Sequence, residues 1–228
     1  MNKIIKLLSL VILSLTVYVI YNNTNNSYYV ITNIGDKLST GTNSYGIKEK
    51  SYTDYYQEYL NKEKTKVIVD NTYSTKNQTV SNMLQLIKET PTVKRKLIDS
   101  NIIIITLGFN DLIYSLSTEE KNSEYVREKI VKEIDKNYNE LINEIKKYYH
   151  HEIIVVGYYK YEKDEFINKG IIELNKSLKR NKEIQYIDTY NLLENKKKYF
   201  NNYNSYYPNS SGYYEISKKI ISKTLEIS

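Results

Sequence analysis

The 228-residue sequence has no cysteine, 2 prolines, 7 glycines and 2 histidines. The lack of cysteine excludes a disulfide framework, a thiolate nucleophile and cysteine-ligated zinc or iron–sulfur sites. Because proline and glycine are scarce, the chain is neither collagen-like nor a Pro/Gly-rich disordered protein. The histidines, His150 and His151, are adjacent, so any mechanism that needs an imidazole has to use one of them.

The residues that are present fit one folded domain. Apolar residues make up 40% of the chain, which is enough for a core at this length, and 26 residues are tyrosine. The net charge is +6, and charges of both signs alternate, as in KEKTK and EKDE. Such mixing is typical of a solvated surface rather than of a stripe that follows a phosphate backbone. We therefore expect no nucleic-acid partner.

The first segment has the pattern of an export signal. Lys3 and Lys6 form a basic head, residues 7–21 are uncharged, and the polar run NNTNN follows. Bulky residues stand where a small-residue cleavage site is expected, so we predict that residues 1–27 remain as a signal-anchor helix and polar linker. A buried core helix is the alternative. The anchor would hold residues 28–228 on the extracytoplasmic face of a membrane; cleavage would release them as a secreted domain.

Beyond this segment the chain shows one alternating pattern without a linker or repeat. Short apolar, β-branched runs predict strands at Tyr28–Ile34, Lys66–Asp70, Asn101–Leu107, Glu152–Gly157 and Ile184–Ile187. Amphipathic patterns predict helices at Ser51–Lys62, Thr79–Glu89, Ser123–Tyr149, Asp164–Arg180 and Ser210–Ile227. The alternation predicts an α/β fold, a three-layer α/β/α sandwich with a five-stranded parallel sheet.

The predicted topology sorts the candidate functional residues. Ligands of open parallel sheets bind where the strands end. The segments that follow strands are therefore candidates, namely 35–41, 71–77 and 108–113. His150 and His151 come directly before a strand, so we expect them at the opposite end of the sheet.

Three motifs occupy such positions. GDKLSTG follows the first strand from Gly35, GFND follows the third from Gly108, and NSYYPNSSGY runs from Asn204 into the last helix. In order and spacing they resemble the SGNH (GDSL) hydrolase family of esterases, lipases, thioesterases and carbohydrate deacetylases. The resemblance covers the chain from about Val30 onward and implies a flavodoxin-like sandwich. The alternative is an unrelated α/β sandwich whose Gly and Asp residues form turns and helix caps.

The sequence departs from the family at its catalytic positions. Lys37, Asn204 and Tyr207 stand where the family has its nucleophilic serine, its aspartate and its histidine. With ordinary pKa values of about 10, Lys and Tyr stay protonated at neutral pH and cannot reproduce the proton relay of such a triad. Residues 74–77 also lack the family's oxyanion-hole glycine. Asn110 alone matches an oxyanion-binding residue.

The first hypothesis is a catalytically degenerate, membrane-tethered member that binds or scaffolds an envelope glycan or acylated polymer. Its pocket would be formed by the family-motif residues Gly35, Asp36, Lys37, Gly108, Asn110, Asp111, Asn204 and Tyr207. We expect no cofactor and no metal, because no Asp-x-Asp pattern or histidine cluster accompanies the two aspartates.

The second hypothesis is an active esterase or acyltransferase. Ser39 would be the nucleophile, activated by Lys37 if burial lowers the pKa of that lysine, and Asn110 would bind the oxyanion. In the simpler interpretation, Ser39 is a hydrogen-bonding residue of the turn after the first strand.

Overall fold

The computed structural model describes residues 9, 11–18, 28–63, 66–118, 123–202 and 205–225. Strands and helices alternate in this part of the chain. Their bounds are β1 (Tyr29–Gly35), α2 (Tyr52–Glu63), β2 (Val67–Ser74), α3 (Val80–Glu89), α4 (Pro91–Ile98), β3 (Ile102–Thr106), α5 (Phe109–Thr118), α6 (Glu124–Lys146), β4 (Ile153–Val156), α7 (Glu165–Leu178), β5 (Gln185–Ile187), α8 (Lys196–Tyr199) and α9 (Ser210–Leu225).

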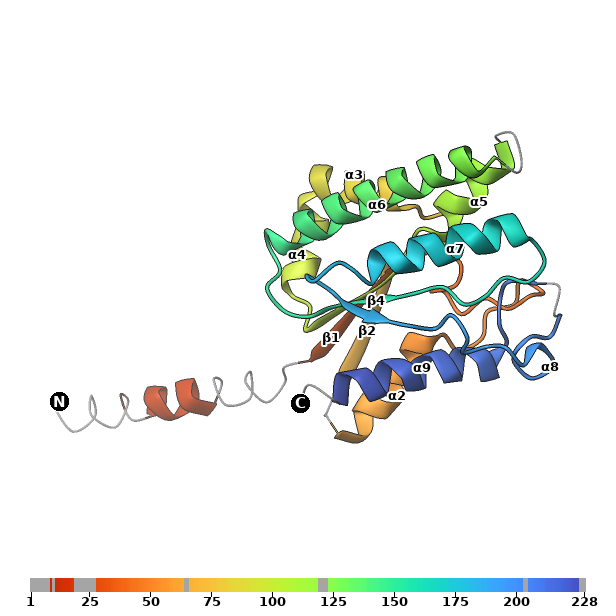
Figure 1. Ribbon diagram of the computed structural model, residues 1–228. Coiled ribbons are helices and arrows are strands. Elements are labelled where there is room, and N and C mark those ends of the chain that lie inside the picture. Colours follow the sequence, from red (N-terminus) through yellow and green to blue (C-terminus); the bar gives the residue numbers. More distant parts are fainter. Residues whose placement is uncertain are drawn as a thin grey trace.

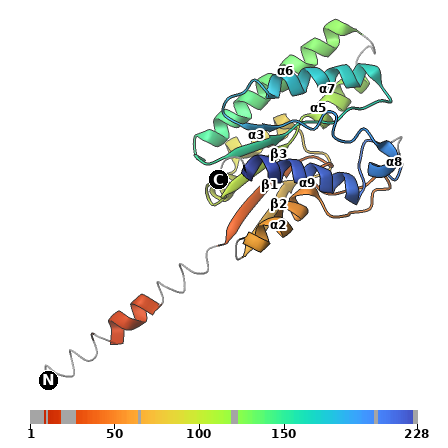
Figure 2. The ribbon, with the colours of Figure 1, turned by 60° about the horizontal axis from the view of Figure 1, so that its bottom comes forward.

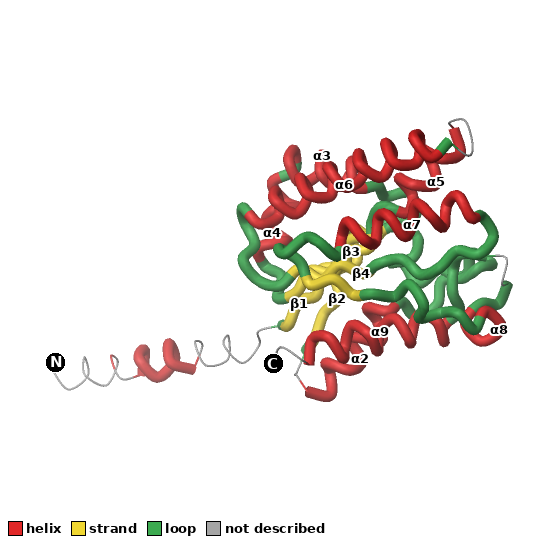
Figure 3. Tube along the Cα trace, viewed as in Figure 1, coloured by secondary structure: helices red, strands yellow, loops and turns green. Residues whose placement is uncertain are grey.

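The sheet is parallel throughout, with the strand order β2-β1-β3-β4-β5. The helices α3 to α7 lie over one face and α2 and α9 over the other (Figure 1). A view turned by 60° and the trace coloured by secondary structure show the same two helical layers (Figures 2 and 3). The predicted α/β fold with a five-stranded parallel sheet between helices is confirmed, and its strand order is that of flavodoxin-like folds.

The central strand β3 explains why its sequence is apolar at nearly every position. All of its residues are at most 5% exposed, because helices cover both faces of the sheet. In a strand that is buried on both sides, alternate polar residues would lose their water without gaining partners. Each fully buried isoleucine contributes about 1.5–3 kcal/mol to folding.

Local side chains fix where several helices begin. The side chains of Thr79, Ser123 and Asp164 accept hydrogen bonds from backbone N–H groups in the first turns of α3, α6 and α7. These caps satisfy donors that have no partner within the helix. Pro91 stands at the start of α4, where its missing N–H costs nothing.

Among the described residues, three helices were not predicted by the sequence analysis: α4, α5 and α8. All three are short, and α5 begins inside the GFND motif, only three residues after β3 ends. A short helix that follows a strand so directly has too few turns for an apolar period to stand out. The motif after β3 is therefore a helix start rather than a loop.

Strand β2 is longer than predicted. Residues 71–74 belong to the strand and not to the loop after it. The pairing with β1 shifts between Thr32, which faces Asp70, and Ile34, which faces Tyr73, so β2 carries one extra residue. Such a bulge lets a strand continue past a polar stretch at the cost of a local bend.

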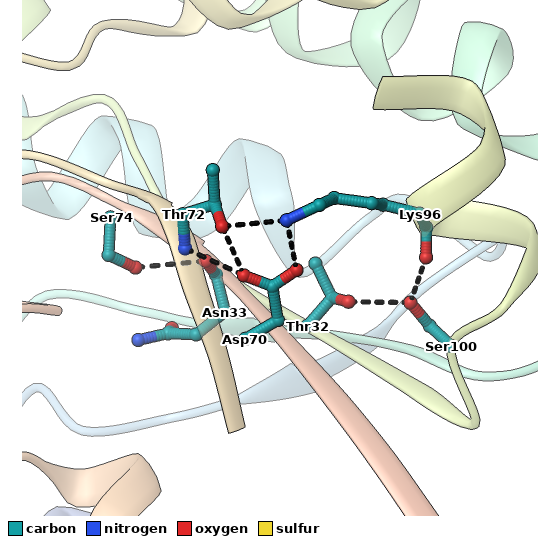
Figure 4. Close-up of polar contacts among 7 residues, drawn as sticks. All are labelled: Thr32, Asn33, Asp70, Thr72, Ser74, Lys96 and Ser100. Atoms are coloured by element: carbon teal, nitrogen blue, oxygen red, sulfur yellow. Dashed lines mark hydrogen bonds and ion pairs between the residues drawn. The ribbon is translucent and has the colours of Figure 1, made fainter. Parts of the chain in front are cut away.

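A polar network ties the edge strand β2 and the neighbouring β1 to α4 (Figure 4). Lys96 Nζ donates hydrogen bonds to Asp70 Oδ2 and to Thr72 Oγ1, both at 2.8 Å. Ser100 Oγ donates to the carbonyl oxygen of Lys96 at 2.8 Å and lies 2.6 Å from the hydroxyl oxygen of Thr32. The partly exposed ion pair adds little stability by itself. The network as a whole fixes the position of α4 against β1 and β2.

Residues 11–18 are helical, and the side chains of Val11, Ile12, Leu13, Leu15 and Val17 are at least 50% exposed. Within the described ranges, no helix has both the length and the apolar character to cross a membrane. Most of the predicted anchor, residues 1–27, lies outside those ranges.

The role of β3 can be tested by truncation. Ile104→Ala removes part of a fully buried side chain. We expect it to lower the free energy of unfolding, measured by urea denaturation, by about 2–5 kcal/mol. Ile98→Ala is the matched control, because that side chain is 53% exposed; its effect should stay within about 0.5 kcal/mol. Equal effects of the two changes would contradict this account of the core.

Candidate functional site

The turn after β1 and the start of α5 meet at the carboxyl end of the sheet. The backbone N–H of Asp36 donates to the carbonyl oxygen of Thr106 at 3.1 Å, which joins the ends of β1 and β3. Gly35 permits this close approach: a Cβ there would lie 2.5 Å from Ser39 Cβ and 2.9 Å from the Thr106 oxygen. The segments that follow β1 and β3 run to opposite faces of the sheet. Flavodoxin-like folds bind ligands at such a point.

The carboxyl group of Asp36 is buried and fully engaged. Its Oδ1 accepts from the N–H of Leu38 at 2.9 Å, and its Oδ2 accepts from the hydroxyl of Tyr158 at 3.0 Å. Burial raises the pKa of Asp36 from 3.8 to about 7, although both hydrogen bonds favour the ionised form. Asp36 therefore links the turn after β1 to the segment after β4 and carries a proton on many molecules near neutral pH.

Lys37 and Tyr207, which the sequence analysis aligned with the family's serine and histidine, are in contact. Lys37 Nζ lies 3.9 Å from the centroid of the Tyr207 ring, in a cation–π arrangement that favours the ammonium form. Burial raises the pKa of the Tyr207 hydroxyl, so the phenol stays protonated. The contact is therefore an ammonium on a ring face and not a proton relay. Asn204, at the aspartate position, lies outside the described residues.

Ser39 is fully buried. Its hydroxyl donates to the carbonyl oxygen of Asp36 at 2.6 Å, and its own carbonyl oxygen accepts from Asn33 Nδ2 at 3.2 Å. These are the bonds of a turn residue. In this arrangement the hydroxyl faces the backbone and is closed to a substrate.

Asn110 has both amide hydrogens committed. Its Nδ2 donates to the carbonyl oxygen of Lys76 at 3.1 Å and to that of Gln78 at 2.9 Å. A side-chain amide has two N–H donors, so binding an oxyanion would require one of these bonds to break. Asn110 thus holds the loop after β2 against the start of α5.

Asp111 caps α3 from a distance in sequence. Its two oxygens accept from the N–H of Val80 at 3.1 and 3.0 Å. A carboxylate at a helix N-terminus is favoured by the helix dipole, but burial raises the pKa of Asp111 to about 6. In the described part of the chain, no three His, Asp or Glu residues are grouped so that they could hold a metal ion.

An aromatic stack lies beside these residues. The ring of Tyr206 is parallel to that of Phe109 within 11°, with centroids 3.6 Å apart, and it also stacks with the ring of Tyr159, with centroids 4.8 Å apart. Because Tyr206 is buried, the stack anchors the segment that presents the next residue, Tyr207, to Lys37. The sequence analysis missed this stack, although two of its rings, Phe109 and Tyr206, lie within the motif segments.

The histidines lie elsewhere. His150 and His151 are exposed in the connection between α6 and β4, before the strand begins. Tyr149, just before them, donates from its hydroxyl to the carbonyl oxygens of Asn101 and Glu152, both at 3.0 Å, at the amino ends of β3 and β4. These bonds place the histidine segment at the end of the sheet opposite the candidate site.

Asn110→Ala tests whether the Asn110 amide holds the loop after β2 against the start of α5. We expect the loss of two buried hydrogen bonds to lower the free energy of unfolding by about 1–3 kcal/mol. Asn77→Ala, in the same loop, is the control, because Asn77 is exposed and accepts only a long 3.4 Å bond from Tyr114. Urea denaturation of both variants measures the difference. A stability unchanged by Asn110→Ala would show that the amide does not hold the loop.

Asp36→Asn tests the buried carboxyl. Between pH 3.8 and about 7 the folded state holds a proton at Asp36 that the unfolded state has lost, so stability falls as the pH rises through this window. Asparagine cannot ionise. The variant should therefore gain stability relative to the unchanged protein by up to about 1.4 kcal/mol per pH unit across the window.

Urea unfolding at several pH values measures this difference. Asp99→Asn is the control, because it removes a carboxyl group that is exposed rather than buried. Parallel stability profiles for Asp36→Asn and the unchanged protein would contradict the buried, proton-holding carboxyl.

Comparison with solved structures identifies close similarity of fold. A lipase from a goat rumen metagenome superimposes with a TM-score of 0.73 at 23% identity, covering 86% of this chain and 97% of that one. A catalytic mutant of an acetylxylan esterase from Geobacillus stearothermophilus gives 0.65 at 15% identity, with coverage of 86% and 94%. A lipase/acylhydrolase from Enterococcus faecalis gives 0.61 at 14% identity, again with coverage of 86% and 94%.

No curated protein matches the chain. The sequence model of the GDSL-like Lipase/Acylhydrolase family, however, matches residues 34–214. The matched range contains all three motif segments and the site assembled from them, and it confirms the resemblance drawn from the motifs. The chain therefore belongs to the GDSL-like lipase/acylhydrolase family.

Proposed function

We propose that this chain is a family member that has lost hydrolysis and uses the carboxyl end of its sheet to bind a ligand. The observation that carries the proposal is that the groups expected to perform ester hydrolysis are unable to do so. Lys37, which we align with the nucleophile, places its ammonium group on the Tyr207 ring. Asn110 donates both of its amide hydrogens to backbone carbonyl oxygens. A nucleophile, a base and an oxyanion donor must all be available for acyl transfer.

The ligand class we propose is an envelope glycan or acylated polymer. The structurally similar acetylxylan esterase acts, by its name, on an acylated polysaccharide, and this similarity of fold supports a ligand of that kind. We also propose that residues 1–27 tether the domain to a membrane, with residues 28–228 on the extracytoplasmic face. The apolar, exposed side chains of residues 11–18 support the tether.

The alternative is an esterase or acyltransferase that uses Ser39 with Lys37 as its activating base. Burial lowers the pKa of Lys37, which favours this role. The position of Ser39 weighs against it, because the side chain is fully buried and its hydroxyl already donates to Asp36. Catalysis there would require the turn after β1 to open.

Hydrolysis assays separate the two functions. The full chain is purified in a nonionic detergent, and multiple turnovers of p-nitrophenyl acetate and of acetylated xylan are followed beside an active acetylxylan esterase. We expect background rates from the unchanged protein, from Ser39→Ala and from Lys37→Ala alike, because none presents an activated nucleophile. Multiple turnovers are needed because an aryl ester can acylate a lysine once without catalysis.

Sustained turnover by the unchanged protein would overturn the non-catalytic function. If Ser39→Ala abolished that turnover, the alternative would replace it.

A further inference from the structure

The segments that lead into the strands meet at the amino end of the sheet, where β1 begins. Asn101, before β3, is joined to β1 by two hydrogen bonds: its Oδ1 accepts from the N–H of Val30 at 2.7 Å, and its N–H donates to the Val30 carbonyl oxygen at 2.8 Å. The N–H of Tyr29 donates to the carbonyl oxygen of Lys66, before β2, at 3.0 Å. The starts of the three strands β1, β2 and β3 therefore lie together.

Two further segments join them. Tyr149, between α6 and β4, donates from its hydroxyl to the carbonyl oxygens of Asn101 and Glu152. Gln185, at the start of β5, donates from Nε2 to the carbonyl oxygen of Lys223, near the end of α9, at 3.2 Å. Figure 1 shows the ends of α6 and α9 on the side where β1 begins. The segments that precede strands or end helices here form what we call the amino-end surface: residues 28, 62–63, 66, 95–101, 147–152, 179–184 and 223–225.

Exposed cations outnumber exposed carboxylates on the amino-end surface. The exposed carboxylates are those of Glu63, Asp99 and Glu183. The exposed cations are those of Lys62, Lys66, Arg95, Lys147, Lys179, Arg180, Lys182 and Lys223. Lys147 and Lys179 have carboxylate partners, Glu144 and Asp188. An excess of positive charge remains without these two lysines.

The dipoles of the helices explain only part of this excess. A cation is favoured in the last turn of a helix, as at Lys62 of α2 and Lys223 of α9. The effect falls off beyond that turn, whereas Lys66 and Lys182 lie between a helix and the next strand. These two lysines therefore add positive charge that the helix ends do not require.

Large apolar side chains lie among the cations of this surface. Tyr28, Ile98 and Leu225 are 52%, 53% and 55% exposed. Lys66 Nζ lies 5.7 Å from the centroid of the Tyr28 ring, so a cation and an exposed aromatic ring are neighbours. Basic side chains mixed with exposed apolar and aromatic ones are typical of surfaces that lie at the boundary between water and lipid.

The length of the preceding segment limits how far this surface can be from a membrane. In the sequence, residues 22–27 separate the uncharged stretch 7–21 from Tyr28. A segment of that length spans at most about 20 Å, even when fully extended. With residues 7–21 in a bilayer, the amino-end surface is the part of the domain nearest to the lipid headgroups.

We propose that the amino-end surface docks on a membrane surface that contains anionic phospholipid. The lipid phosphates compensate the excess of positive charge, and the exposed apolar side chains contact the headgroup region. Docking turns the carboxyl end of the sheet, with Lys37 and Tyr207, away from the bilayer. This inference goes beyond the proposed ligand binding and rests on the proposed tether.

Fluorescence quenching in lipid nanodiscs tests the docking. The chain has no cysteine, so a bimane label can be attached to the variant His150→Cys, on the amino-end surface, or to Thr75→Cys, in the loop after β2; both positions are exposed. The full chain is placed in discs of phosphatidylcholine, or of phosphatidylcholine with about 30% phosphatidylglycerol. A lipid with a nitroxide on its headgroup is the quencher in both kinds of disc.

We expect the label at residue 150 to be quenched more strongly in the discs with phosphatidylglycerol, and the label at residue 75 to be quenched equally in both. Raising the salt from about 20 to about 500 mM should remove the difference at residue 150. Each Lys or Arg near an anionic surface shifts a docking equilibrium by about fivefold. Adding the three changes Lys62→Gln, Arg180→Gln and Lys182→Gln should therefore abolish the extra quenching at residue 150.

The triple variant Lys48→Gln, Lys163→Gln, Lys197→Gln is the matched control. These lysines are exposed and lie after β1, β4 and β5, toward the carboxyl end of the sheet. The same amount of charge is removed, and the extra quenching at residue 150 should remain. Circular dichroism verifies that both triple variants are folded.

Two results would overturn the inference: equal quenching at residue 150 in the two kinds of disc, and equal quenching in the two triple variants. The tether is measured separately, by copurification of the chain with the phosphatidylcholine discs. A chain that copurified only with the discs containing phosphatidylglycerol would contradict the tether and support the docking. A chain that copurified with neither kind of disc would contradict both.

Discussion

The carboxyl end of this sheet depends on one buried acid. Asp36 continues directly from β1, its backbone N–H bonds to the end of β3, and its carboxyl bonds to Tyr158 after β4. A single residue thereby joins three adjacent strands where they end. Burying a carboxyl group is unfavourable, and a raised pKa lets the protein lessen that cost by keeping the proton. The geometry of the turn that presents Lys37 follows from these bonds.

This arrangement accounts for which motif residues the chain has kept. Gly35, Asp36, Asn110 and Asp111 match the family pattern, and each has a structural task here: close approach of strands, a joint between strand ends, a loop clamp and a helix cap. Residues of the triad have no such task, since a triad serves only the reaction. Lys37 and Tyr207 instead stabilise each other through a cation–π contact. Under the proposed function, loss of the chemistry would leave the fold intact.

Much of the fold was predictable from the sequence, whereas the site was predictable only in part. The apolar runs marked all five strands, because strands buried on both faces require them. The short helix α5 was not marked, since it follows β3 too closely for an apolar period to stand out. The approach of Tyr207 to Lys37 follows from placing two motifs at one end of the sheet. The two hydrogen bonds from the Asn110 amide to the loop after β2 depend on packing between segments distant in sequence, which no local pattern encodes.

The network around Lys96 also affects whether strands of two molecules can pair. Strand β2 is at the edge of the sheet, where unpaired backbone groups invite a strand from another molecule. The shift of register opposite Ile34 is a bulge in this edge strand. Lys96 of α4 places its ammonium group against Asp70 and Thr72 of β2. A bulge and a lysine side chain on an edge strand both disfavour the addition of a strand from another molecule. The contacts that secure α4 thus also disfavour pairing of another strand with the β2 edge of the sheet.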